Sequence, residues 1–396
     1  MYSFFVGIDV GKWNHQAAFL NLSGAIAAPD LAFENTDEGF QLLLKSLSAF
    51  DREQTVVGLE ATGHYWLALF SFLVDNAWTV KVINPMQSDA LRNINIRKTK
   101  TDRRDAVLIA DVMRFGRYTE TTLPEENLLQ IRELSRCRVG QVELISSLKR
   151  KILGILDRIF PEFASCFSTV FGKAPTELLQ EYADPEELAN CDVETLVKLL
   201  EKQSRGRHSE AKARELKDKA AKSVGIRLAL DALKFQLRLL LQQLDFIKAQ
   251  IKELDKFLKK LMKEYDILFS IPGISVTLGA AIIGEIGDIN RFGTPQQLQA
   301  FAGMDPTVHQ SGNFQGTQGK MSKRGSPFLR RAVYLAANAA HRVDPVFKEH
   351  YDKMVARGKH PNQALGAVAT KILRVVHAVL KTRKPYDPAK LVFPAT

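Results

Sequence analysis

The chain has few of the features that mark secreted or membrane-spanning proteins. Its three cysteines, Cys137, Cys166 and Cys191, form no CxxC pair. That spacing supports neither a zinc knuckle nor a disulfide framework, so reduced, structural thiols are expected. Apolar runs such as 280–283 are too short to span a bilayer, and the residues after Met1 lack the basic segment of a signal peptide. These absences predict a cytoplasmic protein with no membrane partner.

Acidic residues are outnumbered by basic ones. The chain has 55 Lys and Arg against 44 Asp and Glu, which gives a formal net charge of +11 and a pI near 9.4. An excess of this size favours a polyanionic partner, with nucleic acid as the leading candidate. At 396 residues the chain is longer than a usual single core, so two or three domains are expected.

The first 125 residues alternate between strand and helix patterns, which predicts an α/β unit. A strand, a short turn at 11–14 and a second strand fit a hairpin, so the sheet is expected to be mixed. The expected strands are 4–10, 15–20, 55–60 and 79–83, and the expected helices are 38–47, 65–76 and 101–115.

Residues 126–265 are predicted to be helical. Apolar residues recur at alternating spacings of three and four residues, as in the seam of a coiled coil. We expect the helix that packs on this seam to come from another copy of the chain rather than from the same chain. Prolines at 161, 175 and 185 indicate a helical insertion at 160–210, and an α-rich domain is expected over 266–396. The seam consists of Leu230, Leu233, Leu237, Leu240, Leu244, Ile247, Ile251, Leu254, Leu258 and Leu261.

Four acidic residues stand at positions suited to a divalent metal. Asp9 and Glu60 lie in or after apolar strands, where an unpaired carboxylate is costly. Asp102 and Asp105 are three residues apart and share one face of a helix that Thr101 can cap. For this last pair alone, the positive end of a helix dipole is a sufficient explanation. All four together indicate a site for Mg²⁺ or Mn²⁺.

Two groups of basic residues are candidates for phosphate contacts, although solvated charged loops are the ordinary alternative. The turn 272–275 is similar to a helix-hairpin-helix element, whose backbone at Gly273 would contact phosphates, but a plain αα-hairpin fits nearly as well. The first group is Arg92, Arg97, Lys98, Lys100, Arg103 and Arg104, and the second is Lys320, Lys323, Arg324, Arg330 and Arg331.

Ser311 precedes Gly312 in a polar segment, which by itself indicates an ordinary turn. Only the neighbouring cations and the distant carboxylates make its hydroxyl a candidate nucleophile.

Several blocks in this order resemble the DEDD transposases of the IS-one-ten insertion-sequence family, which are related to the Piv DNA invertases. The resemblance covers residues 1 to about 125 and 265 to 385. Ser275, where the family hairpin has a second glycine, and the long middle region depart from it. The blocks are Gly7-Ile8-Asp9, Glu60-Ala61-Thr62-Gly63-His64-Tyr65, Val82-Ile83-Asn84-Pro85, residues 100–106 from Lys100 to Ala106, Ile271-Pro272-Gly273-Ile274 and Ser311-Gly312.

The resemblance implies a RuvC-like, RNase H-type first domain that binds metal through Asp9, Glu60, Asp102 and Asp105. It also implies a C-terminal transposase domain whose Ser311 forms a covalent link to DNA. Homo-oligomers (a dimer, or a tetramer on DNA), a bridge-type noncoding guide RNA and a prokaryotic, nucleoid-associated location follow from it as expectations.

Three other functions remain open at this point. A nuclease or junction resolvase would share the acidic residues and use water. An actin-like kinase would explain Gly7 to Gly11, but the chain lacks a clear Asp-Gly-Gly loop. A non-catalytic nucleic-acid-binding scaffold would need no carboxylates on strands.

Overall fold

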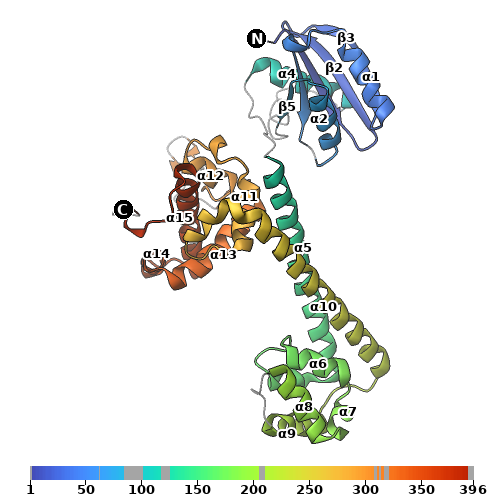
Figure 1. Cartoon of the computed structure of the whole chain (residues 1–396), viewed down its shortest axis with the longest axis vertical. Coiled ribbons are helices and arrows are strands. Elements are labelled where there is room, and N and C mark those ends of the chain that lie inside the picture. Colours follow the sequence, from blue (N-terminus) through green and yellow to red (C-terminus); the bar gives the residue numbers. More distant parts are fainter. Residues whose placement is uncertain are drawn as a thin grey trace. The chain divides into compact units, whose positions relative to one another are not determined.

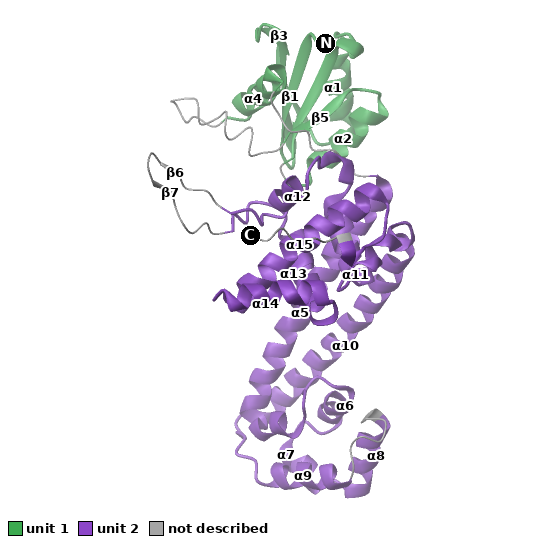
Figure 2. Ribbon diagram, turned by 90° about the vertical axis from the view of Figure 1, so that its left-hand side faces the viewer, with its two compact units in different colours: residues 1–123 green, residues 124–396 purple. Residues whose placement is uncertain are grey.

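The computed structural model describes residues 2–61, 63–83, 101–116, 125–204, 210–306, 310–311, 314–315 and 321–390. The chain divides into two compact units, residues 1–123 and 124–396 (Figure 2). The boundary lies beside the one expected at residue 125. A further division near residue 265 stays a prediction.

Five strands of the described part of unit 1 form one sheet in the order β3-β2-β1-β4-β5, and Figure 1 labels β2, β3 and β5. The pairs β1–β2 and β2–β3 are antiparallel, whereas β1–β4 and β4–β5 are parallel. The expected mixed sheet is therefore confirmed. The strands are β1 (Phe4–Val10), β2 (Asn14–Asn21), β3 (Ile26–Glu34), β4 (Thr55–Glu60) and β5 (Val80–Ile83).

Strand β3 was not predicted from the sequence. It contains Pro29 and lies at the edge of the sheet, where a residue without an N–H is tolerated. Most of its side chains are at least partly exposed, so the apolar alternation of a half-buried strand is missing. Only the pairing with β2 makes it a strand.

Helices cover both faces of this sheet. Helices α1 (Asp37–Leu47) and α2 (Trp66–Asp75) share a buried cluster with Val6 and Ile8 of β1. Helix α4 (Asp102–Phe115) covers the other face, in a cluster with Phe5 and Val56. Alternate residues of each strand therefore face α4, as the two-residue period of a strand requires.

Two long helices of unit 2, α5 (Glu126–Ile159) and α10 (Leu230–Leu261), lie side by side (Figures 1 and 2). Leu237 and Leu244 of the predicted seam are fully buried in a cluster with Ile152 and Ile155 of α5. The preference for a partner helix from another copy is thus wrong for this seam, because α5 and the insertion of the same chain fill it.

The helical insertion expected at 160–210 is present and extends to residue 221. It packs against α5 and α10 around Phe163, Leu178 and Leu216. Its elements are η2 (Pro161–Cys166), α6 (Lys173–Glu181), α7 (Pro185–Asn190), α8 (Val193–Ser204) and α9 (Glu210–Ala221).

The remainder of unit 2 is mostly helical around one core. Helix α15 is long and apolar enough to cross a membrane by length and composition, but Val368, Ile372 and Val376 are buried in that core. The elements are η3 (Met262–Ser270), α11 (Val276–Ile286), η4 (Ile289–Arg291), α12 (Pro295–Phe301), β6 (Gln310–Ser311), β7 (Phe314–Gln315), α13 (Pro327–Val343), α14 (Pro345–Ala356), α15 (Pro361–Thr382) and η5 (Pro388–Lys390).

Candidate active site

Asp9 and Glu60 stand at the carboxyl ends of two neighbouring parallel strands. The register of β1 and β4 pairs Ile8 with Leu59, so the next residues, Asp9 and Glu60, lie at one level. Side chains along a strand alternate between the two faces of the sheet. Because Gly7 and Gly58 face α4, Asp9 and Glu60, two residues further on, face α4 as well. The backbone therefore places these two carboxylates on the same face of the sheet, at the carboxyl ends of β1 and β4. We call this end of the sheet, marked by Asp9 and Glu60, the acidic edge.

Helix α4 approaches this face closely because two glycines leave room for it. A Cβ on Gly7 would lie 2.1 Å from the Ala106 carbonyl oxygen and 2.4 Å from the Ala110 nitrogen. A Cβ on Gly58 would lie 2.4 Å from the Met113 sulfur. The helix backbone thus rests directly on β1 beside Asp9.

The start of α4 points toward the acidic edge. Its last turn lies toward the opposite edge, where the Arg114 guanidinium approaches Gly24 in the turn after β2. The Thr101 hydroxyl accepts a hydrogen bond from the Arg104 N–H and caps the helix. Asp102 and Asp105 stand in this first turn, where both complement the helix dipole.

The four carboxylates differ in exposure. Asp105 is 5% exposed, Asp9 and Glu60 are half-buried, and Asp102 is exposed. Asp9, Glu60 and Asp105 each have an interaction within the chain. Within the described residues, no group of three or more His, Cys, Asp or Glu side chains is gathered closely enough to hold an ion. The strand register thus brings Asp9 and Glu60 together, and the carboxylate oxygens of all four residues are donors of the kind that Mg²⁺ or Mn²⁺ binds.

The first basic group is only partly described. Arg92, Arg97, Lys98 and Lys100 lie outside the described residues. Arg103 forms an ion pair with Asp30 of β3, so it joins the start of α4 to the edge strand. Arg104 is exposed and stays a candidate phosphate contact.

Ser311 belongs to unit 2, on a small β-hairpin between α12 and α13. Strand β6 pairs with β7 so that Ser311 opposes Phe314, and an isolated bridge joins Pro306 to Met321 nearer the base. The predicted nucleophile is thus placed at the far end of a hairpin.

The base of this hairpin is firmly attached to the core. The Ser322 hydroxyl donates to the Asp305 carboxylate, and the Lys323 N–H donates to the Gly303 carbonyl at 3.0 Å. Arg330 donates to the Ala302 carbonyl at 2.9 Å. These bonds fix the point from which the hairpin extends.

The second basic group therefore has mixed roles. Arg330 holds the hairpin base, and Arg331 lies 4.0 Å from Glu143 of α5. Lys323 and Arg324 are exposed, whereas Lys320 lies outside the described residues. Among the described residues of this group, Lys323 and Arg324 remain the best candidates for phosphate contacts.

The turn before α11 is explained by packing inside the chain. Gly273 has a φ of +84°, and a Cβ there would lie 2.4 Å from the Ala336 carbonyl oxygen of α13. The Ser275 hydroxyl accepts a hydrogen bond from the Leu278 N–H and caps α11. Ser275 thus has a capping role of its own, and phosphate binding at Gly273 stays a prediction.

A buried polar network escaped the sequence analysis. The Glu285 carboxylate, with a side chain 4% exposed, accepts hydrogen bonds from Arg136 Nε at 2.6 Å and Ser326 Oγ at 2.7 Å. The bond to Glu285 raises the pKa of Arg136. Burial, and secondarily Arg136, lowers the pKa of Arg132. Glu285 thus ties α11 to α5 and to the start of α13.

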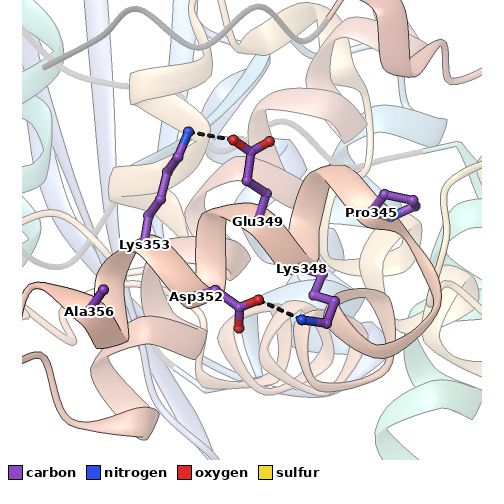
Figure 3. A pocket seen from close by; sticks show the side chains of 6 residues that line it. All are labelled: Pro345, Lys348, Glu349, Asp352, Lys353 and Ala356. Carbon is purple, nitrogen blue, oxygen red and sulfur yellow. Dashed lines mark hydrogen bonds and ion pairs between the residues drawn. The ribbon is translucent and has the colours of Figure 1, made fainter.

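A shallow hollow on α14 has no evident catalytic character (Figure 3). Two ion pairs, Lys348–Asp352 and Lys353–Glu349, neutralise its charges, and both are drawn in the close-up. The lining residues are Pro345, Lys348, Glu349, Asp352, Lys353 and Ala356.

Aromatic side chains at the acidic edge were also missed. Trp13 is 71% exposed in the turn between β1 and β2, and His64 and Tyr65 follow Glu60. A tryptophan inside a short polar turn was the available signal, because such turns are usually built from small or polar residues.

Comparison with known proteins shows the family of the chain. One family model, described as a transposase, matches residues 6–161, and another, described as the transposase IS116/IS110/IS902 family, matches residues 265–352. Together they match more than half of the chain.

Two relatives align over nearly the whole length of the chain, and a third aligns over part of it. A 44.8 kDa protein of insertion element IS116 from Streptomyces clavuligerus is 25% identical over 97% of this chain and 96% of its own. The pilin gene-inverting protein of Moraxella bovis is 24% identical, over 97% of each chain. The transposase of insertion sequence IS1111A from Coxiella burnetii is 31% identical over 30% of this chain and 33% of its own. With an acidic edge in the first matched region and the serine hairpin in the second, this chain belongs to the IS110 family of transposases.

Proposed function

We propose that the protein excises and inserts a mobile DNA element by metal-dependent strand exchange through a phosphoserine intermediate. The observation that carries the proposal is the placement of Asp9 and Glu60 at one level and on one face, beside the first turn of α4. Such a placement suits a phosphodiester site, because carboxylate oxygens at the ends of neighbouring strands can bind a divalent cation that a phosphate also contacts.

Asp9, Glu60, Asp102 and Asp105 would hold Mg²⁺ or Mn²⁺. When bound, the ions neutralise charge on the phosphate and on the departing oxygen. The chain itself supplies the fixed geometry: the two strands hold Asp9 and Glu60, and the capped helix holds Asp105 beside Gly7. Arg104 and the basic residues before it would position the phosphate backbone.

Ser311 would act as the nucleophile. Its Oγ forms a bond to phosphorus while one bond from that phosphorus to a deoxyribose oxygen breaks; the serine loses a proton and the freed oxygen gains one. A deoxyribose hydroxyl then attacks the phosphoserine and releases Ser311. Each step exchanges one phosphoester for another, so the exchange needs no nucleotide cofactor.

The partners we propose are the DNA of the element ends and target, together with a structured, bridge-type noncoding RNA. Base pairing by such an RNA would select the sequence, and the protein would hold the backbone and shape. The excess of basic residues, with a net charge of +11, supports binding of long polyanions in the cytoplasm. An RNA-free protein that recombines one sequence with full selectivity would disprove the guide.

We also propose a homo-oligomer, with the outer face of α10 as its contact. Phe235, Phe246 and Phe257 are 62%, 64% and 50% exposed, and they recur every eleven residues, close to three helical turns. In a straight helix these three side chains form one row along the face of α10 opposite the buried Leu237 and Leu244.

A second copy fits this row in an antiparallel arrangement. A twofold axis at Phe246 would place Phe235 opposite Phe257 of the other copy. The same register would bring Arg238 beside Glu253 of the other copy, so both apolar and charged groups would match. Phe246→Asp should lower the mass measured by sedimentation, whereas Leu144→Asp, at an exposed position on α5, should not. An unchanged mass for Phe246→Asp would refute this contact.

Ser311→Ala tests the chemistry directly. The variant should bind DNA and RNA like the parent protein but form no covalent adduct with DNA, and Asp105→Asn should lose metal-dependent strand exchange. If an adduct persists without Ser311, the nucleophile is misassigned.

Complementation tests whether sites are shared between subunits. A mixture of Ser311→Ala and Asp105→Asn proteins should recover part of the activity if the serine of one subunit completes the acidic edge of another. A mixture as inactive as either variant would argue that each subunit is self-contained.

A second candidate is site-specific inversion. The full-length similarity to pilin gene-inverting proteins favours it, and the same residues would serve. Recombination substrates with inverted sites and with element ends separate the two reactions. A metal-dependent nuclease or junction resolvase using water would cleave DNA without any covalent adduct.

A further inference from the structure

An exposed aromatic side chain lies at the same end of the sheet as Asp9. Trp13 lies in the turn after β1, four residues beyond Asp9. His64 and Tyr65 follow β4, with ring centroids 4.3 Å apart. Tyr65 is the N-cap of α2, and α2 packs on the face of the sheet opposite α4, so Trp13 is the aromatic side chain to consider beside Asp9.

The turn that carries Trp13 is held in a fixed conformation. The Gly11 N–H donates to the Asn14 carbonyl at 3.1 Å, and the Asn35 N–H donates to the Trp13 carbonyl at 2.8 Å. The Asn35 side-chain amide also donates to the Lys12 carbonyl at 3.2 Å. Hydrogen bonds from the chain after β3 therefore hold the backbone at Lys12 and Trp13, so this turn needs little further backbone ordering to bind a ligand.

The indole itself is left open to solvent. Trp13 is 71% exposed, whereas Trp66 and Trp78 are each 6% exposed and belong to the interior. The Lys12 ammonium lies 4.5 Å from the Trp13 ring centroid. An exposed ring beside a cation is the combination that binds nucleic-acid strands, with the ring for a base and the cation for a phosphate.

Trp13 lies at the same end of the sheet as Asp9. The chain reverses through the Gly11–Asn14 turn directly after the strand pairs Asp9–Gln16 and Val10–His15, so one DNA strand can contact both the indole and the acidic edge.

We propose that the Trp13 indole, with the Lys12 ammonium next to it, stacks on an unpaired base near the phosphate at the acidic edge. This rests on the proposed function and narrows its substrate to DNA that is locally unpaired. Bases inside a duplex already stack on each other, so an indole on the protein surface reaches a base face only where pairing is broken.

Binding of fluorescein-labelled oligonucleotides to the full-length chain tests the proposal. The probes are a single strand of mixed sequence and a hairpin duplex containing that sequence, compared by anisotropy without added metal. Trp13→Ala should weaken single-strand binding about tenfold to a hundredfold and change duplex binding less than about twofold, while Trp13→Phe stays near the parent. Leu22→Ala, 55% exposed at the opposite edge of the sheet, is the matched control and should change neither.

Intrinsic fluorescence gives a second readout, because Trp13 is the exposed tryptophan of the three. The single strand should quench the parent protein, and this quenching should be absent in Trp13→Phe although binding persists. Equal weakening of both probes by Trp13→Ala, or no weakening at all, would overturn the proposal. So would a loss of oligomeric mass with unchanged DNA binding, which would make Trp13 a protein contact.

The outcome is separable from that of the proposed function. If the parent protein forms no Ser311 adduct but Trp13→Ala still weakens single-strand binding, the proposed recombinase chemistry is wrong and the proposed stacking role of Trp13 is right. If adducts form and Trp13→Ala binds single strands as the parent does, only the proposed stacking role of Trp13 is wrong.

Discussion

Replacing Gly7 with alanine should separate α4 from the sheet and misplace the acidic residues that the helix carries. The added Cβ would lie 2.1 Å from the Ala106 carbonyl oxygen, and ordinary contact begins at 3.4 Å. The helix must therefore recede by about 1.3 Å near Ala106. Neither neighbour can rotate away, because both the Ala106 oxygen and the Ala110 nitrogen belong to the helix backbone.

Two costs follow from this displacement. Overpacking of a well-filled interface typically costs about 1–3 kcal/mol of folding stability. Misplacing catalytic groups by about 1 Å can reduce a rate roughly a hundredfold. Gly58→Ala is the matched control at the same interface, because its Cβ would meet the Met113 side chain at a similar 2.4 Å. A methionine side chain can move, so Gly58→Ala should cost less in stability and much less in activity.

Urea unfolding followed by circular dichroism measures the stability, and adduct formation on labelled DNA measures the rate. We expect Gly7→Ala to lose activity even at temperatures where it is fully folded. If Gly7→Ala keeps parental stability and activity, or if Gly58→Ala is equally damaged, close backbone packing is not what positions Asp102 and Asp105.

Three further predictions concern unit 2. Ser275→Ala removes the cap of α11 and should cost about 1 kcal/mol in urea unfolding, with Ser275→Asn restoring most of it; an unchanged midpoint would contradict the capping role. Glu285→Ala leaves Arg136 and Ser326 without their shared partner and should cost about 2–4 kcal/mol, measured as a lower Tm, with Glu285→Gln intermediate. Burial, with Lys371, Lys353 and Arg357, lowers the pKa of His350 to about 4. The folded state therefore binds this proton less readily than the unfolded state, and stability should fall as the pH drops from about 6.5 to 4. His350→Gln should flatten that part of the profile, and a profile identical to the parent's would assign the loss to other groups.

Much of unit 1 could be predicted because its strands carry strong local patterns. Residues 4–10 and 55–60 are apolar runs that end at carboxylates, so both the strands and the candidate ligands were visible in the sequence. The edge strand β3 was not, since Pro29 and its exposed side chains give no alternating pattern. Its position is set by pairing with β2 and by the ion pair from Asp30 to Arg103.

The seam of α10 shows a different limit. A spacing of three and four residues predicts that a helix partner exists, but it contains no information about which chain supplies that partner. Here α5 of the same chain supplies the partner, and Leu237 and Leu244 are buried against it. The outer phenylalanines were overlooked because a repeat of eleven residues is not the heptad that coiled-coil reasoning looks for.

Gly7 and Gly273 illustrate why the remaining site details needed three dimensions. In the sequence each is a glycine inside a motif, and for Gly273 a phosphate contact is the prediction. In the structure each marks a place where a helix backbone, α4 or α13, comes too close for any side chain. The close approach at Gly7 fixes the carboxylates of α4, whereas that at Gly273 joins the turn before α11 to the helix that follows the Ser311 hairpin. The acidic edge and the serine hairpin are therefore each built by packing within their own unit, which is why variants of one half can be used to test the other.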